Sequence, residues 1–125
     1  MPALAFVDLE TTGATATRDR ITEIGIVEVD EDGSVREWEQ LLNPGVSISP
    51  FIVNLTGISN AMVAEAPEFA DVAAMVLEKL RGRLFIAHNA RFDYGFLKNE
   101  FKRCGIDFRA SVLCTVKLSR ALHPE

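Results

Sequence analysis

The sequence is poor in cysteine and contains no long apolar run. Its 125 residues include two cysteines, Cys104 and Cys114, which fit neither a zinc site nor a disulfide framework, so we expect reduced thiols in a cytoplasmic protein. No apolar run approaches the roughly 20 residues of a membrane span. Residues 1–7 are apolar but lack a basic flank, so we expect neither a signal peptide nor a membrane segment.

Internal repeats, low-complexity tracts and linker-like stretches are also absent, so we expect residues 1–125 to belong to one domain. With 48% hydrophobic and 25% charged residues, the composition is typical of a folded globular protein. Residues 1–78 hold 14 acidic and 3 basic side chains, whereas residues 79–125 hold 4 acidic and 10 basic ones. Two interpretations stay open: two solvated faces of opposite sign, or a basic wall beside an acidic centre that suits a phosphate backbone and metal ions.

Apolar runs and alternation of polar and apolar residues predict five strands. These strands are expected over residues 3–9, 21–29, 35–42, 84–87 and 112–115. The turn sequence at residues 30–34 predicts an antiparallel hairpin, and the strands separated by helices should pair in parallel. Residues 43–45 and 49–50 break the pattern with proline and glycine. The expected fold is α/β, a mixed sheet with flanking helices.

Two apolar stripes at helical spacing predict the two main helices. The first stripe consists of Phe69, Val72, Ala73, Val76 and Leu80, followed by Gly82 as a stop signal. The second consists of Phe92, Phe96, Leu97, Phe101 and Cys104, between Asn89 as N-cap and Gly105. A last helical turn or two is expected near residues 117–122.

Three carboxylates are the candidate catalytic groups. Asp8 and Glu10 stand two apart at the end of the most apolar strand, so their side chains leave the same face of the sheet. Asp93 begins the helix after the strand at 84–87, and functional groups of open α/β sheets gather at the carboxyl ends of parallel strands. Burying like charges is costly without a cation. An exposed strand end, and an acid that merely favours a helix N-terminus, are the alternatives.

If these carboxylates converge, they offer hard oxygen ligands for Mg²⁺ or Mn²⁺. Two such ions could generate hydroxide from water and stabilise a leaving alkoxide in phosphodiester hydrolysis. No side-chain nucleophile is then required.

Residues 8–13 (DLETTG) resemble the first motif of the DEDD exonucleases, the DnaQ-like branch of the RNase H-like fold. Residues 88–93 (HNARFD) resemble the second motif, and residues 55–58 (LTGI) resemble the segment that faces the terminal nucleotide. The resemblance covers most of the chain, with the motifs in the family's order.

The resemblance implies that Asp8, Glu10 and Asp93 are catalytic and hold two divalent cations, Mg²⁺ or Mn²⁺. It also implies a set of contacts to the 3′-terminal nucleotide: Thr11, Thr12, Leu55, Thr56, His88, Asn89 and Phe92. The implied reaction is the 3′→5′ removal of nucleoside monophosphates from single-stranded DNA, in proofreading or repair. The implied partners are a DNA polymerase subunit or a fused nuclease domain. An apolar wedge such as Leu55 or Phe92 can hold a base without reading its identity.

The third motif of the family, a histidine base followed by a last aspartate, is not matched. The chain ends at residues 123–125 (HPE), and His123 has no aspartate after it. His88 belongs to the second motif and is a poor substitute for the base. We therefore expect the N-terminal portion of a longer exonuclease domain, with its C-terminal part missing and with weak or no activity.

Three other functions stay open. A haloacid dehalogenase-like phosphatase also places an aspartate after an apolar strand, but it needs an aspartate where this chain has Glu10. An exonuclease of the same fold that acts on RNA would carry the same motifs. A non-catalytic module could bind nucleic-acid ends without hydrolysing them.

Overall fold

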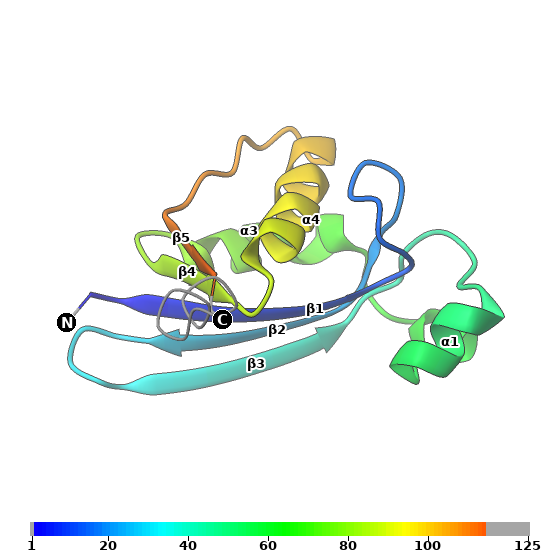
Figure 1. The fold of residues 1–125 in the computed structure, drawn as a ribbon, viewed down its shortest axis with the longest axis horizontal. Coiled ribbons are helices and arrows are strands. Elements are labelled where there is room, and N and C mark those ends of the chain that lie inside the picture. The colour runs from blue at the N-terminus through cyan, green and yellow to red at the C-terminus, as the bar shows by residue number, and fades with distance from the viewer. Residues whose placement is uncertain (1, 115–125) are drawn as a thin grey trace, which may run out of the picture.

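The computed structural model describes residues 2–114, which form one five-stranded sheet with helices around it (Figure 1). Its elements, in chain order, are β1 (Leu4–Thr11), β2 (Ile21–Val29), β3 (Val35–Leu41), α1 (Pro50–Thr56), α2 (Asn60–Val63), α3 (Phe69–Leu80), β4 (Leu84–Ala87), α4 (Ala90–Arg103) and β5 (Val112–Cys114). The strand order is β3-β2-β1-β4-β5. β1 pairs antiparallel with β2 and parallel with β4, which confirms the predicted mixed sheet.

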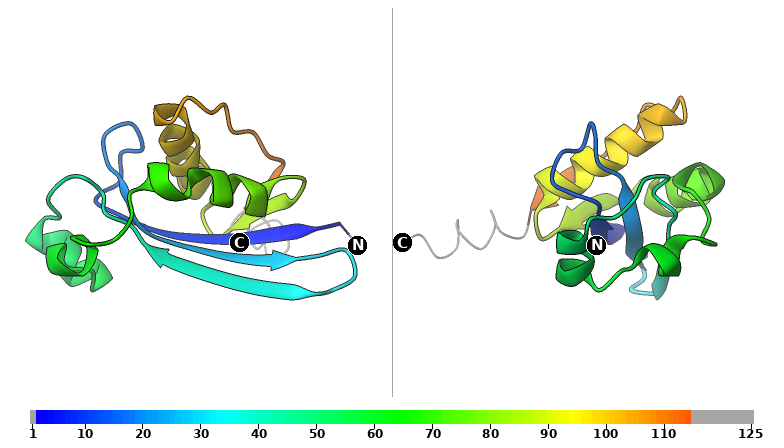
Figure 2. Two further views of the ribbon diagram at one scale, coloured as in Figure 1. Left: turned by 180° about the vertical axis from the view of Figure 1, so that it is seen from behind. Right: turned by 90° about the vertical axis from the view of Figure 1, so that its right-hand side faces the viewer.

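One face of the sheet carries the main core. Figures 1 and 2 show α3 and α4 on the same side of the strands. Alternate residues of β1, among them Ala5, Val7 and Leu9, point into this layer and are buried with the apolar stripes of α3 and α4. The opposite face, which we call the open face, receives Phe6, which is 42% exposed, and Asp8. Alternate residues of β1 therefore pack into the core, while the residues between them, including Asp8, lie on the open face.

The predicted strands and the two main helices are confirmed, with small differences at their ends. β1 runs on to Thr11 because β2 continues to pair with it as far as Ile21. Gly33, Gly82 and Gly105 all have positive φ angles, as turns and helix ends require. Residue 115 and the helical turn expected near residues 117–122 lie outside the described residues.

The N-cap prediction for α4 is only half right. Asn89 does precede the helix, but its φ and ψ angles of −123° and 76° leave its side chain without a capping hydrogen bond. The amides of Phe92 and Asp93 donate instead to the backbone carbonyl of Asn89. The Asn89 amide group is therefore not used to begin the helix.

Two short helices lie where the sequence suggested only a break. Ser49 caps α1 by accepting from the Ile52 amide, Pro50 occupies the first turn, and Gly57 ends the helix with φ of 78°. α1 and α2 build a second small core, separate from the main one. Figure 1 shows α1 beyond the end of the sheet where β1 finishes. No helix in residues 2–114 is long and apolar enough to cross a bilayer.

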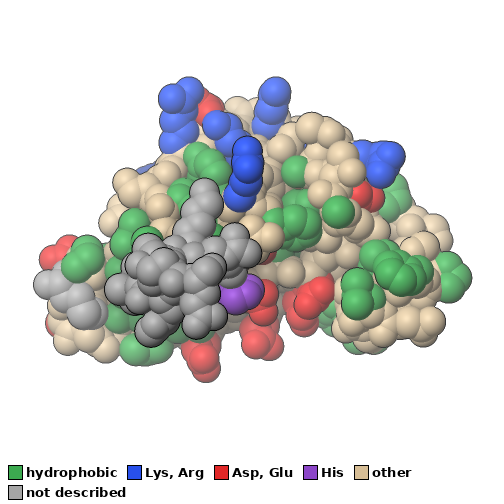
Figure 3. All heavy atoms as spheres, in the orientation of Figure 1, with side chains coloured by type: hydrophobic (Ala, Val, Ile, Leu, Met, Phe, Trp, Pro, Cys, Tyr) green, Lys and Arg blue, Asp and Glu red, His purple; other side chains and the backbone are tan. Residues whose placement is uncertain are grey.

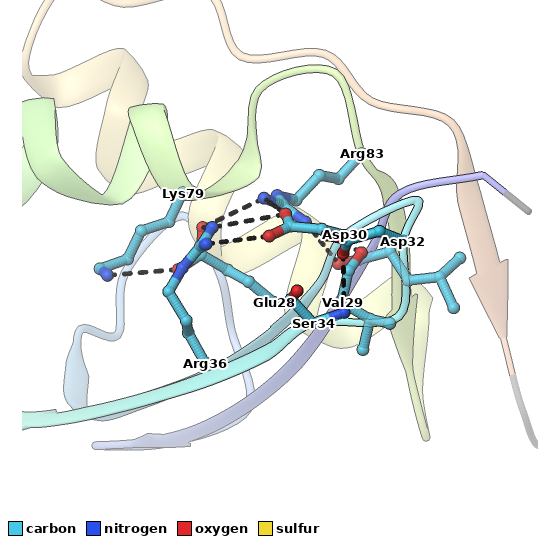
Figure 4. A network of polar contacts seen from close by, with 9 residues as sticks. Glu28, Val29, Asp30, Asp32, Ser34, Arg36, Lys79 and Arg83 are labelled. Carbon is cyan, nitrogen blue, oxygen red and sulfur yellow. Dashed lines mark hydrogen bonds and ion pairs between the residues drawn. The ribbon is translucent and has the colours of Figure 1, made fainter.

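A charged network ties the hairpin to α3 and β4 at the other end of the sheet (Figure 4). Glu28 of β2 lies 3.2 Å from Nη2 of Arg36 and 3.4 Å from Nζ of Lys79. Arg83, just before β4, contacts Glu28 and donates to the carbonyl of Val29 at 3.0 Å. Burial raises the pKa of Glu28, but Arg36 and Lys79 outweigh it and hold that pKa below its ordinary value.

Candidate active site

Asp8 and Glu10 lie on the open face at the carboxyl end of β1. Asp8 is exposed and Glu10 is half-buried, while Leu9 between them points into the core. Burial, followed by the charges of Asp8 and Glu23, raises the pKa of Glu10 above its ordinary value. A cation bound at this end of β1 would offset both the burial of Glu10 and the repulsion from the neighbouring acids.

Asp93 joins the pair from α4. The parallel pairing of β1 with β4 sets Phe6 beside Ile86, so the helix that follows β4 begins next to the end of β1. Asp93, in the first turn, is 7% exposed. Burial, and then the charges of Asp8 and Glu10, raise its pKa from 3.8 to about 7. The charges of Asp8 and Glu10 therefore act on Asp93 across the space between β1 and α4.

The acidic cluster extends further across the sheet than the sequence motifs indicated. Glu23 of β2 lies directly opposite Glu10 in the β1–β2 register, and Glu39 of β3 lies opposite Gly25. Burial, Glu39 and Asp8 raise the pKa of Glu23. Alternation in β2 could have revealed this residue, since Ile24 and its like-facing neighbours point into the core and leave Glu23 on the open face.

A hollow of about 430 Å³ lies over this part of the open face. It is lined by Phe6, Asp8 and Glu10 of β1, Glu23 and Gly25 of β2, Glu37 and Glu39 of β3, and Ile86 and His88 at β4, among others. Figure 3 shows acidic side chains and a histidine together on one face of the molecule, with hydrophobic side chains beside them over α1. The hollow thus combines carboxylates with an apolar floor.

The donor set suits a hard divalent cation, although the carboxylates are not gathered into a finished ligand shell. Within residues 2–114, no three His, Cys, Asp or Glu side chains are placed to hold a metal ion as they stand. Asp93, however, forms no hydrogen bond or ion pair with any described residue, and burial together with the charges of Asp8 and Glu10 raises its pKa, so a cation would stabilise its charged form. Asp8 is exposed on the open face.

Thr11, the last residue of β1, and Thr12, the residue after it, use their hydroxyls in different hydrogen bonds. Thr11 is 7% exposed and its Oγ1 donates to the Gly13 carbonyl at 2.6 Å, so its side chain lies on the core side. The hydroxyl of Thr12 accepts from the Arg20 amide at 3.0 Å and donates to Asp19 Oδ1 at 3.3 Å. Both hydroxyls make hydrogen bonds within the loop. The backbone next to Thr11 and Thr12, and not their hydroxyls, is therefore the part that a ligand could contact.

The remaining predicted contacts come from two places. On α1, Leu55 is 70% exposed, while the hydroxyl of Thr56 donates to Ile52 at the helix end. At the start of α4, His88 and Asn89 are exposed, and the half-buried ring of Phe92 packs on Phe96 with ring centroids 4.7 Å apart. Leu55 is thus available to a ligand, and Phe92 serves the core as well. His123 lies outside the described residues.

Comparisons with known proteins identify the family of this chain. Residues 5–125 match the RNase T family model, described as exonuclease. The chain is 41% identical over 118 residues to the PolC-type DNA polymerase III of Caldanaerobacter subterraneus, and 38% identical over 121 residues to the 3′-5′ exonuclease DinG of Staphylococcus haemolyticus. These alignments cover 94% and 96% of the chain but only 8% and 13% of the relatives, so the chain spans a small part of their length.

Solved structures give the same result. Exonuclease X in complex with 5′ overhanging duplex DNA is 31% identical, with a TM-score of 0.76 over 97% of this chain and 64% of its own. Exonuclease I of E. coli with a dA13 oligonucleotide is 22% identical, with a TM-score of 0.86 over all of this chain and 31% of its own, a likeness of fold. The chain therefore belongs to the RNase T family of exonucleases and has the family's RNase H-like fold.

Proposed function

We propose that this chain hydrolyses phosphodiester bonds at the 3′ ends of single-stranded DNA and releases nucleoside monophosphates. The observation that carries the proposal is the neighbourhood of Asp8, Glu10 and Asp93, in which burial, followed by the charges of Asp8 and Glu10, raises the pKa of Asp93 to about 7. Strongly perturbed carboxylates beside a hollow are typical of catalytic sites. The relatives include a protein named as a 3′-5′ exonuclease, which supports degradation of the strand from its 3′ end.

Asp8, Glu10 and Asp93 would hold two divalent cations, Mg²⁺ or Mn²⁺. Bound there, the ions would supply the Lewis acidity that activates a water and stabilises the leaving oxygen. The fit rests on the oxygen donors of the three acids, and on the burial and mutual repulsion that raise the pKa of Asp93 and that a cation would offset.

The neighbouring residues would bind the terminal nucleotide without reading its sequence. Leu55 is exposed and apolar, and stacking on apolar or aromatic side chains tolerates any base. The proposed contacts are the backbone at Thr11 and Thr12 and the side chains of Leu55, Thr56, His88, Asn89 and Phe92. The PolC-type and DinG relatives suggest a larger polymerase or nuclease assembly as the partner of this segment.

The test is a single-turnover assay with protein in excess over a 5′-labelled single-stranded oligonucleotide, because excess protein reveals even slow hydrolysis. We expect a ladder of products shortened from the 3′ end in Mg²⁺ or Mn²⁺. Asp8→Asn and Asp93→Asn should abolish the ladder, whereas Asp107→Asn, at an exposed aspartate far along the chain, should not. Metal-independent products, or a ladder that survives in Asp93→Asn, would contradict the proposal.

The same assay separates the alternatives. A matched RNA oligonucleotide that is degraded faster than the DNA would make RNA the substrate. Retained binding of the oligonucleotide without hydrolysis would identify a non-catalytic end-binding module. A haloacid dehalogenase-like phosphatase disagrees with the exonuclease family match and with the antiparallel β1–β2 pair.

A further inference from the structure

Glu100 is a buried acid that the proposed chemistry does not use. It lies on α4, is 1% exposed, and accepts from Arg20 Nε at 3.0 and 3.1 Å through its two carboxylate oxygens. It also accepts from the Ile21 amide at 3.1 Å. Arg20 ends the β1–β2 loop, residues 12–20, and Ile21 begins β2, so Glu100 joins the end of this loop to a helix 80 residues further along the chain.

Arg103, three residues after Glu100, adds a second attachment. Its Nη1 lies 3.2 Å from Glu100 Oε1, and its Nη2 donates to the carbonyls of Ala16 and Thr17 at 3.3 and 3.1 Å. The loop is therefore held at its middle by Arg103 and at its end through Arg20. We call Arg20, Glu100 and Arg103 the α4 anchor.

Inside the loop, hydrogen bonds transmit this position to Thr12. The Thr12 amide donates to the Arg20 carbonyl at 2.8 Å, and the Arg20 amide donates back to Thr12 Oγ1 at 3.0 Å. Asp19 accepts from Thr12 Oγ1 and from the Thr15 amide. A Cβ atom on Gly13 would come within 2.5 Å of the Asp19 carboxylate, so a larger residue there would displace the side chain that makes these hydrogen bonds.

The same helix also carries Asp93. Glu100 follows Asp93 by seven residues, about two turns or roughly 10 Å along a rigid helix. The loop that follows Glu10 and the third carboxylate are thereby attached to one body. An ion pair at this depth is a poor source of stability by itself, because desolvation offsets much of its attraction. A fixed geometry between two parts of a site is the better account.

We propose that the α4 anchor is a positioning device, which fixes Thr12 and its neighbouring backbone relative to Asp93 so that the terminal nucleotide is presented to the carboxylates. Glu100 touches neither nucleotide nor ions and acts through Arg20 and Arg103. This inference rests on the proposed function, since it takes the loop as a nucleotide contact.

The test compares Glu100→Gln, Arg103→Ala and Arg103→Lys with the wild-type protein and with Arg109→Ala. Arg103 is 30% exposed in its side chain, so its variants should fold even where Glu100→Gln does not. Arg109 is an exposed cation paired with Asp107 outside the loop, which makes it the matched control. Two measurements are made on each: hydrogen exchange of the Thr12 and Arg20 amides, and single-turnover hydrolysis at increasing protein concentration.

We expect Glu100→Gln and Arg103→Ala to speed exchange of these two amides about tenfold or more, with no change at the α3 amides. The half-saturating protein concentration should rise roughly tenfold, while the maximal rate should change less than about threefold. The reason is that the contact between the loop and the nucleotide contributes equally to the bound state and to the transition state. The Mg²⁺ dependence should stay unchanged. Arg103→Lys should recover part of the loss, and Arg109→Ala should match the wild-type protein.

Unchanged exchange in both variants would overturn the anchor. Faster exchange with unchanged half-saturation would overturn its role in positioning, even though the proposed function would stand. A wild-type protein that neither binds nor hydrolyses the oligonucleotide would instead refute the proposed function and this inference with it. A shifted Mg²⁺ dependence would place Glu100 in the ion site, also against the proposal.

Discussion

Replacing Asp93 with asparagine should stabilise the metal-free protein at pH 8. Burial and the charges of Asp8 and Glu10 raise the pKa of Asp93 from 3.8 to about 7. At 1.36 kcal/mol per pKa unit, the folded protein loses at most about 4 kcal/mol by ionising this group. Because Asp8 is exposed to water, which screens its charge, about 2 kcal/mol is the gain we expect on substitution.

The sign of the pH dependence follows from the raised pKa. The folded state binds this proton more tightly than the unfolded state, so wild-type stability should fall as the pH rises from about 4 to above 7. The advantage of Asp93→Asn should therefore be largest at pH 8 and vanish near pH 4. Urea unfolding in EDTA at both pH values measures it. Asp107→Asn, an identical change at an exposed side chain, should stay within about 0.5 kcal/mol of wild type.

Addition of Mg²⁺ or Mn²⁺ should then reverse the order. The wild-type protein should gain stability with increasing ion concentration, while Asp93→Asn should gain little. A variant that is less stable than wild type at pH 8 in EDTA would refute the idea that three acids repel one another at this site. An equal response of both proteins to the ions would refute the role of Asp93 in holding them.

Three further predictions test other parts of the structure. Glu28→Gln should reduce the free energy of unfolding in urea at pH 7 by about 1–3 kcal/mol. Burial raises the pKa of Glu28, but Arg36 and the other neighbouring cations lower it by more, so that the folded-state pKa lies below the ordinary value. The stabilisation by Glu28 should therefore be present above pH 4.5 and disappear as the pH falls through the folded-state pKa. Gly13→Ala should displace the loop, because the new Cβ meets the Asp19 carboxylate at 2.5 Å, and should destabilise the protein by about 1–3 kcal/mol while weakening oligonucleotide binding in a fluorescence anisotropy titration. Leu55→Ala removes a side chain that is 70% exposed, so unfolding should change by less than about 0.5 kcal/mol while the same titration shows binding weaker by about 1–3 kcal/mol.

Periodicity in the sequence was sufficient to predict the strands, α3 and α4, since each buries a regular apolar pattern. It was insufficient for α1 and α2. Ser49-Pro50 was interpreted as a break in the pattern, yet in the structure Ser49 is the N-cap of a seven-residue helix that Gly57 ends. A helix this short gains its stability from a small separate core, and such packing leaves no clear periodic signal.

The site divides in the same way. Asp8 and Glu10 could be placed from strand alternation, and Asp93 from the parallel pairing of neighbouring strands. Glu23 was missed because its position opposite Glu10 depends on the register of two strands. The contact of Glu100 with Arg20 joins residues 80 apart, and no local pattern in either segment announces it.

The central position of β1 also determines when the site can form. β1 pairs with β2 after a short loop, but its other neighbour, β4, comes only after α3. At a synthesis rate of about 5–20 residues per second, a growing chain carries its first two site carboxylates for several seconds before the helix of the third exists. A ribosome-bound nascent chain therefore cannot assemble the complete acidic cluster until α4 has emerged and docked, which delays any nuclease activity until most of this segment has been made.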